Sequence, residues 1–146
     1  MKKYILIVLF VVLGAGSSVA QDWETDFTSA KAVANKKDMP IILVFQGSDW
    51  CTPCIKLDRE VWNTNDFKVY AKEHYVMLQA DFPRRKRNAL SLEQTNRNKV
   101  LAEKYNRNGI FPFVVIMDDT GKVLGETSYK RLPVMAYIEE LNTFIK

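Results

Sequence analysis

The chain has 146 residues, of which 47% are apolar and 26% charged, and its formal net charge is +4. This composition is that of one globular domain, and it excludes a disordered chain, collagen and a coiled coil. The 21 basic and 17 acidic residues are interspersed along the sequence. The positive excess therefore does not by itself indicate a nucleic-acid-binding protein.

The first 20 residues have the layout of an export signal. Two lysines precede ten consecutive apolar residues, 4–13, and a small-x-small triplet follows at 18–20. Ten residues of helix cover roughly 15 Å, about half of a hydrocarbon core, which disfavours a membrane anchor. We predict that residues 1–20 are a cleaved signal peptide. Residues 21–146 would then be a soluble domain in the periplasm or another exported, oxidising location.

The rest of the sequence alternates between helical and strand periodicity. Helices are expected over residues 26–35, from Pro53 to about Val61, from Asn65 to about Tyr75, over 91–105, and from Pro133 to Ile145. Strands are expected over residues 41–45, 76–81, 113–117 and 122–125, with a hairpin turn at 118–121. After the first helix the order is βαβαββα, which requires a mixed sheet with helices on both faces.

The two cysteines, Cys51 and Cys54, are separated by Thr52 and Pro53 at a strand-to-helix turn. Proline suits the first helical turn because its missing N–H would be unpaired there. Cys51 is therefore expected at a helix N-terminus, where unpaired N–H groups and the helix dipole can lower a thiol pKa from about 8.5 to about 7. Cys51 would attack a substrate disulfide, and Cys54, one turn below, would resolve the mixed disulfide.

Three other interpretations of the cysteine pair compete with redox chemistry. With His74 as the single histidine, the chain offers three zinc ligands of the usual kind, which disfavours a structural zinc site. A disulfide that closes so short a loop removes little unfolded-state entropy. The interpretation of the pair as two inert buried thiols remains open, although the flanking Trp50 and the helix start favour redox chemistry. No imidazolium lies between the cysteines, which favours a reductant over a strong oxidant.

The cysteine motif and its surroundings resemble the thioredoxin superfamily. Residues 50–54 read Trp-Cys-Thr-Pro-Cys, a buried strand precedes them at 42–45, and Gly-Ile-Phe-Pro-Phe follows at 109–113. The closer resemblance is to exported thioredoxin-like proteins and to the reductase domain of periplasmic thiol-disulfide interchange proteins, in which Gly-Ser-Asp-Trp-Cys-x-x-Cys, here 47–54, is typical. It implies an α/β thioredoxin fold for residues 21–146, with a central mixed β-sheet flanked by helices on both faces.

The resemblance also implies roles for individual residues. Cys51 would be the exposed nucleophile and Cys54 the buried resolving thiol, with Pro112 as a cis-proline that faces them. The backbone of Phe111 would pair with an extended stretch of substrate. Trp50 would cover part of the thiolate and offer the substrate a flat apolar contact.

The sequence departs from the family pattern at the proton acceptor. Typical thioredoxins have a buried Asp six residues before the first cysteine and a facing Lys on the next strand, and here these positions hold Phe45 and, by alignment, Met77. Either water or a carboxylate such as Asp49, Asp58 or Glu60 would replace the missing acid, or resolution would be slow.

The loop after the second predicted strand is longer than a minimal thioredoxin needs. It contains four consecutive basic residues, Arg84, Arg85, Lys86 and Arg87. A solvated surface run is the favoured interpretation of such a short charge run, and a docking patch for an acidic partner is the alternative.

The sequence as a whole predicts an exported protein-disulfide reductase. It would act on disulfide-containing proteins, be re-reduced by a membrane thiol-disulfide electron donor, and work as a monomer without metal, cofactor or nucleic acid. A non-catalytic peptide-binding module of the same fold is the alternative, suggested by Phe45, Phe111 and Phe113. Within the redox class an oxidase or isomerase stays open, because direction depends on reduction potential and partners.

Overall fold

The computed structural model describes residues 21–145, so the predicted signal peptide, residues 1–20, lies outside the described residues. Within this range five strands form one sheet in the order β1-β3-β2-β4-β5. Their bounds are β1 Trp23–Glu24, β2 Ile41–Gln46, β3 Val76–Asp81, β4 Phe113–Met117 and β5 Val123–Thr127. β3 is parallel to β1 and β2, whereas β4 is antiparallel to β2 and β5. The predicted mixed sheet is confirmed.

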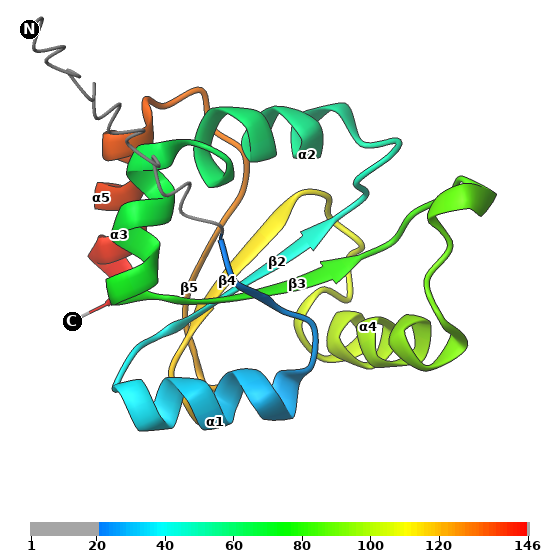
Figure 1. The fold of residues 1–146 in the computed structure, drawn as a ribbon, viewed down its shortest axis with the longest axis horizontal. Helices are drawn as coiled ribbons and strands as arrows, with labels where there is room; N and C mark the ends of the chain where they lie inside the picture. Colours follow the sequence, from blue (N-terminus) through cyan, green and yellow to red (C-terminus); the bar gives the residue numbers. More distant parts are fainter. Residues whose placement is uncertain (1–20, 146) are drawn as a thin grey trace, which may run out of the picture.

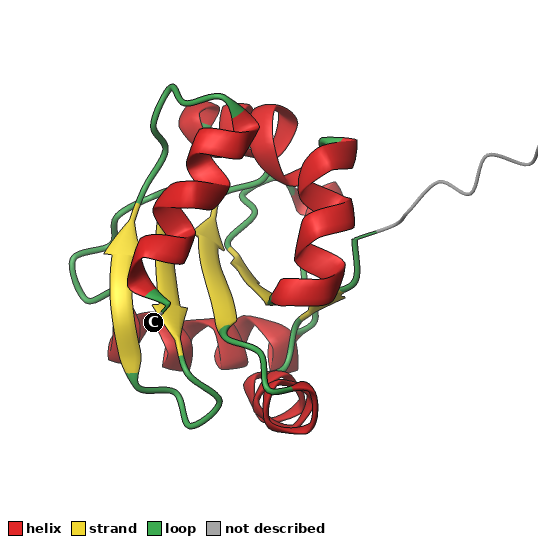
Figure 2. Cartoon of the chain, turned by 90° about the vertical axis from the view of Figure 1, so that its left-hand side faces the viewer, coloured by secondary structure: helices red, strands yellow, loops and turns green. Residues whose placement is uncertain are grey.

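Helices cover both faces of this sheet, as the sequence predicts (Figures 1 and 2). They are α1 Phe27–Lys37, α2 Thr52–Leu57, the π-helix η1 Asp58–Trp62, α3 Asn65–His74, the 3-10 helix η2 Lys86–Asn88, α4 Leu92–Tyr105 and α5 Val134–Phe144. Side chains of Asp26, Thr64 and Ser91 cap the N-termini of α1, α3 and α4. None of the helices in residues 21–145 is both long enough and apolar enough to cross a membrane.

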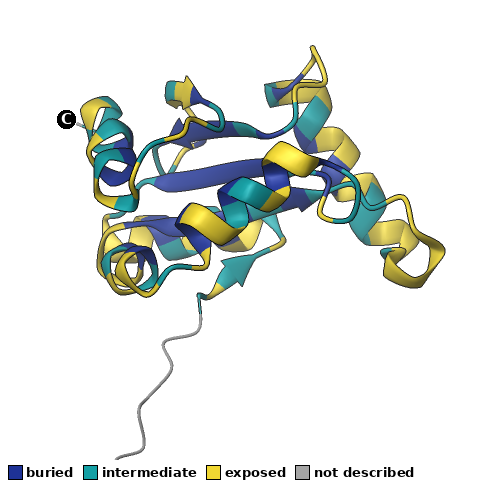
Figure 3. Ribbon diagram, turned by 90° about the horizontal axis from the view of Figure 1, so that it is seen from above, coloured by how far each residue is buried: buried dark blue, intermediate teal, exposed yellow. Residues whose placement is uncertain are grey.

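The central strand β2 explains why the fold has two cores. Successive side chains of β2 point to opposite faces of the sheet, and helices cover both faces. Residues 41–45 are therefore all fully buried. Ile42 and Val44 pack with residues of α2, η1, α3 and α5. Leu43 and Phe45 pack with residues of α1 and α4. Figure 3 shows the resulting buried sheet between more exposed helices.

Two features differ from the sequence prediction. β1 was not predicted, because a strand of two residues, Trp23 and Glu24, is too short to show alternation. The helix that begins after Cys51 does not stay α-helical, since the N–H of Asn63 donates to the carbonyl of Asp58 at 2.7 Å and closes a five-residue turn. This wider turn buries both Val61 and Trp62, which are neighbours in sequence.

Candidate active site

The dithiol lies where β2 ends and α2 begins. Cys51 is the N-cap residue of α2, and Pro53 lies in the first turn, as predicted. Cys51 and Cys54 form a disulfide, with their Cα atoms 5.2 Å apart. The structure therefore shows the oxidised state of the pair.

Each of the two sulfurs accepts a hydrogen bond from one main-chain N–H group. The N–H of Cys54 donates to Sγ of Cys51 at 3.3 Å, as an N-cap hydrogen bond, and the N–H of Gly47 donates to Sγ of Cys54 at 3.5 Å. After reduction, a donor placed at a helix N-terminus favours the thiolate of Cys51 over the thiol. The predicted position of Cys51 at a helix N-terminus is confirmed.

The exposure of the cysteines differs from the expectation. Cys51 is 5% exposed and Cys54 is 3% exposed, so Cys51 is not an exposed residue in the disulfide form. Cys51 lies in a tight turn, in which its N–H donates to the carbonyl of Gly47 at 2.9 Å. The indole of Trp50 lies directly on Gly47, where it leaves no room for a side chain. The two cysteines are therefore alike in burial, and each sulfur accepts one main-chain N–H.

Trp50 and Phe111, two predicted substrate contacts, lie together beside the dithiol. Their rings meet edge to face with centroids 5.6 Å apart, and Phe111 in turn contacts Phe82 at 5.5 Å. The indole Nε1 donates to the carbonyl of Phe82 at 2.7 Å. This bond fixes the indole against Gly47 and Phe111.

The chain on both sides of Phe111 is held in place. The peptide bond between Phe111 and Pro112 is cis, as the resemblance implies. Pro112 is buried, and its carbonyl accepts a hydrogen bond from the Ser128 hydroxyl at 2.6 Å. On the other side, the Asn106 side chain bonds both the N–H and the carbonyl of Ile110. The Phe111 backbone therefore has a fixed position next to Trp50.

The position of the missing buried acid is apolar on both strands. Phe45 is fully buried, pairs with Ala80 of β3, and stacks on Phe113 with ring centroids 6.3 Å apart. Met77 pairs instead with Ile42 and belongs to the core on the opposite face of the sheet. The alignment of Met77 with the facing lysine was wrong, because three residues of register separate it from Ala80.

Asp49, the first of the three candidate proton acceptors, is committed elsewhere. Its carboxylate accepts the N–H groups of Arg84 and Arg85, each at 3.0 Å, and Nδ2 of Asn88 at 2.9 Å. The bonds from Arg84 and Asn88 do most to lower the pKa of Asp49 from 3.8 to about 2. Such a carboxylate is a weak base, so Asp49 serves the loop and not the dithiol.

Asp58 and Glu60 differ in the direction of their pKa shifts. The hydroxyl of Tyr129 bonds to Glu60 at 2.7 Å and lowers its pKa. Asp58 is half-buried at the start of η1, and desolvation raises its pKa although Nδ2 of Asn63 donates to it at 3.3 Å. Asp58 follows Cys54 by four residues, which places the two on the same side of the helix. It is the candidate whose pKa is shifted toward that of a proton acceptor.

Sequence reasoning missed the contacts that attach the end of β3 and the loop of residues 82–91 to the dithiol turn. Besides Asp49, they include Asp81, whose carboxylate accepts both the N–H of Ser48 at 2.9 Å and its hydroxyl at 2.6 Å. Most of these partners are main-chain groups more than 30 residues away in sequence, so no residue pattern announces them. Figure 1 shows the two segments at the same end of the sheet.

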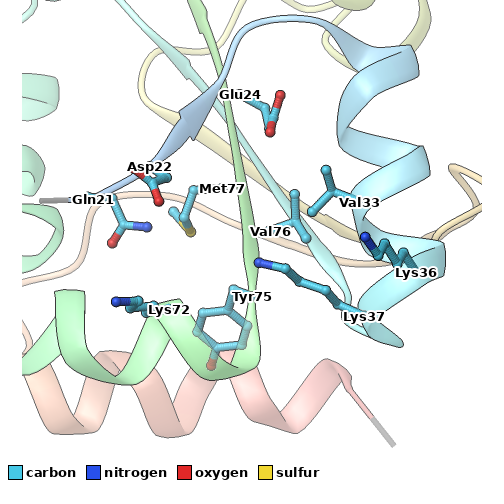
Figure 4. A pocket seen from close by; sticks show the side chains of 10 residues that line it. All are labelled: Gln21, Asp22, Glu24, Val33, Lys36, Lys37, Lys72, Tyr75, Val76 and Met77. Atoms are coloured by element: carbon cyan, nitrogen blue, oxygen red, sulfur yellow. The ribbon is translucent and has the colours of Figure 1, made fainter.

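A separate cavity of about 440 Å³ lies at the other end of the sheet (Figure 4). Lys36 and Lys37 of α1 and Lys72 of α3 contribute to its lining, together with Tyr75, which precedes β3. It contains neither cysteine. Within residues 21–145, no three Cys, His, Asp or Glu side chains gather so that they could hold a metal ion.

Comparison with known proteins agrees with this geometry. A thioredoxin-like family model matches residues 22–119. The chain is 32% identical over 124 residues to disulfide bond reductase DsbH of Chlamydia pneumoniae, which covers 85% of this chain and 72% of that protein. Thioredoxin-related protein DsbJ of the same organism is 23% identical over 95 residues, or 65% of this chain and 26% of that protein.

Solved structures show the same fold. A DsbH oxidoreductase structure superposes with a TM-score of 0.80 at 26% identity, covering 99% of this chain and 94% of the other. The oxidised C-terminal domain of Neisseria meningitidis DsbD superposes with a TM-score of 0.54 at 17% identity, covering 79% and 89%. The predicted thioredoxin fold is therefore confirmed. With its Cys-x-x-Cys dithiol and its homology to a disulfide bond reductase, the chain belongs to the thioredoxin-like family.

Proposed function

We propose that this protein is a disulfide bond reductase in which Cys51 attacks the substrate and Cys54 resolves the intermediate. The observation that carries the proposal is the Cys51–Cys54 disulfide at the start of α2, with the N–H of Cys54 bonded to Sγ of Cys51. The similarity to DsbH, named as a disulfide bond reductase, supports the direction of electron flow.

The reaction is two successive thiol-disulfide exchanges. The Cys51 thiolate bonds to one substrate sulfur, the substrate S–S bond breaks, and the leaving thiolate takes up a proton. Cys54 then loses its proton, its thiolate bonds to Sγ of Cys51, and the second substrate thiol is released. The substrate gains two electrons and two protons, and the enzyme ends as the disulfide seen here.

The second exchange needs an acceptor for the proton of Cys54. Asp58 fits this role, because its raised pKa makes it a better base than Asp49 or Glu60. Asp58 lies one helical turn after Cys54, which supports this assignment.

Trp50, Phe111 and Pro112 form the proposed substrate-binding surface. The fixed backbone at Phe111 suits pairing with an extended substrate chain. Ile55 and Ile110, each 44% exposed, add apolar surface on the elements that adjoin the dithiol. The proposed substrates are disulfide-containing proteins, as for a disulfide bond reductase.

Export and re-reduction are part of the same proposal. Residues 1–20 are proposed as a signal peptide, which N-terminal sequencing of the exported protein checks. In an oxidising compartment the disulfide must be returned to the dithiol, and a membrane thiol-disulfide electron donor is the proposed source of the two electrons. The protein is proposed to act as a monomer, which sedimentation analysis checks.

Reduction of insulin or a model disulfide tests the proposal. Cys51→Ser is expected to abolish turnover, and Cys54→Ser to trap a mixed disulfide with the substrate. Equilibration with glutathione tests the direction, since a potential near −270 mV marks a reductant and one near −120 mV an oxidant. Full turnover by Cys51→Ser would contradict the proposal, and peptide binding without thiol exchange would favour a non-catalytic module.

A further inference from the structure

The loop of residues 82–91 carries a concentration of charge that the exchange reactions do not use. Its four consecutive basic residues are all exposed, as Figure 3 shows for this projecting segment. Residues 21–146 contain 19 basic and 17 acidic residues, because Lys2 and Lys3 belong to the proposed signal peptide. Without the four basic residues of this segment, 15 basic residues remain against 17 acidic ones, so the segment carries the positive excess of the domain.

The segment is fixed to the dithiol turn by its main chain. Asp49 accepts the N–H groups of Arg84 and Arg85, and its low pKa keeps this carboxylate ionised at neutral pH. Asp49 offsets one positive charge, so the segment keeps a net excess. The ion pairs found within residues 21–145 involve Arg59, Arg97 and Lys130, and none of the four loop side chains.

The same segment also contacts the residue next to the nucleophile. The guanidinium carbon of Arg84 lies 3.7 Å from the ring centroid of Trp50, in a cation–π contact. Trp50 directly precedes Cys51, and its indole is tied to the carbonyl of Phe82. The guanidinium of Arg84 therefore lies next to the residue that precedes Cys51, and the other three basic residues follow it directly in sequence.

We propose that Arg84, Arg85, Lys86 and Arg87 form a docking surface for an acidic polypeptide segment next to the disulfide of a protein substrate. This inference rests on the disulfide reductase function and names a substrate class for it. Arg84 contacts the residue next to Cys51, so a substrate that binds this segment would present negative charge close to its disulfide. Arginine suits this partner because its planar guanidinium binds carboxylates with two parallel hydrogen bonds.

Reduction of matched peptide disulfides tests the docking surface. Three peptides with the same disulfide carry flanking Glu, Gln or Lys residues, and kcat/KM is measured at low and high salt. We expect about tenfold faster reduction of the Glu peptide than of the Gln peptide at low salt, and a small difference at about 0.5 M salt, where charges are screened. The triple variant Arg85→Gln, Lys86→Gln, Arg87→Gln, which leaves Arg84 on Trp50, is expected to lose most of the preference for the Glu peptide and to keep the wild-type rate on the Gln peptide.

A matched control removes the same charge elsewhere. The triple variant Lys36→Gln, Lys37→Gln, Lys72→Gln alters exposed lysines at the far end of the sheet (Figure 4) and is expected to keep the preference for the Glu peptide. Equal loss in this control would overturn the proposal in favour of a net-charge effect. A loop variant that keeps the preference, or that loses rate on the Gln peptide as well, would overturn it too.

Two further measurements separate the other outcomes. Cosedimentation with anionic vesicles that depends on residues 85–87, without any peptide preference, would assign the loop to a membrane surface and overturn the proposal. If the wild-type protein reduces none of the peptides, the proposed function fails. Titration with a disulfide-free Glu peptide then still tests the docking surface. Binding by the wild type and the lysine control, but not by the loop variant, would support the surface. Equal binding by both triple variants would overturn it.

Discussion

The two ends of the sheet are held together by different kinds of contact. At the end that carries the dithiol, the carboxylates of Asp49 and Asp81 accept hydrogen bonds mainly from main-chain N–H groups, those of Arg84 and Arg85 for Asp49 and that of Ser48 for Asp81. At the other end, helix is joined to helix by side chains, since Tyr75 donates to Asn142 at 2.5 Å and Asn142 donates to Tyr70 at 2.8 Å.

This difference indicates that one end of the sheet serves the reaction and the other serves the stability of the fold. Contacts to main-chain N–H groups fix the path of a loop, and here the loop positions the dithiol and its surroundings. Contacts between partly buried side chains of α3 and α5 and the buried Tyr75 before β3 stabilise the packing of the two helices without reaching the site. Substitutions at the dithiol end are therefore expected to change rates, and those at the far end to change the free energy of unfolding.

The cysteines give the largest expected effect at the dithiol end. Cys51→Ser is expected to lower the rate of disulfide reduction by at least about 10³-fold, because the hydroxyl is a far weaker nucleophile than the thiolate. Cys54→Ser is expected to accumulate a mixed disulfide, which mass spectrometry detects. Circular dichroism should show an unchanged fold in both, because the loop that the disulfide closes is short. If both variants were as active as the wild type, the dithiol end would not be the end at which substitutions change the rate.

Asn142→Ala tests the far end. It removes both hydrogen bonds of Asn142 and leaves the buried hydroxyl of Tyr75 without its partner, so we expect a loss of about 2 kcal/mol in the free energy of unfolding. The rate of disulfide reduction should not change. Urea denaturation measures the stability, and Thr143→Ala on the exposed side of the same helix is the control, with a change under about 0.5 kcal/mol. A slower reaction in Asn142→Ala would show that the two ends are coupled.

Asp58→Asn tests the proton acceptor near Cys54. We expect resolution of the mixed disulfide to slow about tenfold, less than the full effect of a general base because water can replace it. The attack by Cys51 should keep its rate, which rapid-mixing kinetics separates from resolution. Glu60→Gln, on the same helix and already bonded to Tyr129, is the control. If Asp58→Asn and Glu60→Gln resolve equally fast, Asp58 does not take the proton.

The sequence was sufficient to predict the parts of the site that depend on local structure. The position of Cys51 follows from one apolar strand, a turn and Pro53, all within a few residues. The cis bond before Pro112 was available from family resemblance alone. Neither the local sequence pattern nor the family resemblance predicted the register of β2 against β3, in which Phe45 pairs with Ala80. The reason is that β2 is apolar on both faces and has no alternation by which to align it.

The long-range polar contacts were beyond prediction for a different reason. Asp49, Asp58 and Glu60 are three carboxylates within twelve residues, and the sequence does not distinguish them. Their pKa shifts differ because Asp49 meets main-chain N–H groups of a distant loop, Asp58 is partly desolvated, and Glu60 meets Tyr129. Only the folded chain brings these partners together.

The smallest expected effect is the pH dependence of the loop attachment. Because folding lowers the pKa of Asp49 from 3.8 to about 2, its contribution to stability is complete above pH 3.8 and is lost as the pH falls toward 2. The denaturation midpoint of the wild type should therefore drop more over this interval than that of Asp49→Asn, which has no charge to lose. The fluorescence of Trp50 should change over the same interval, because its indole stacks on Arg84 of the attached loop. Parallel pH profiles for the two proteins would mean that the Asp49 carboxylate does not hold the loop. The contacts of Asp49 to main-chain N–H groups would then not be what distinguishes this end of the sheet from the far end.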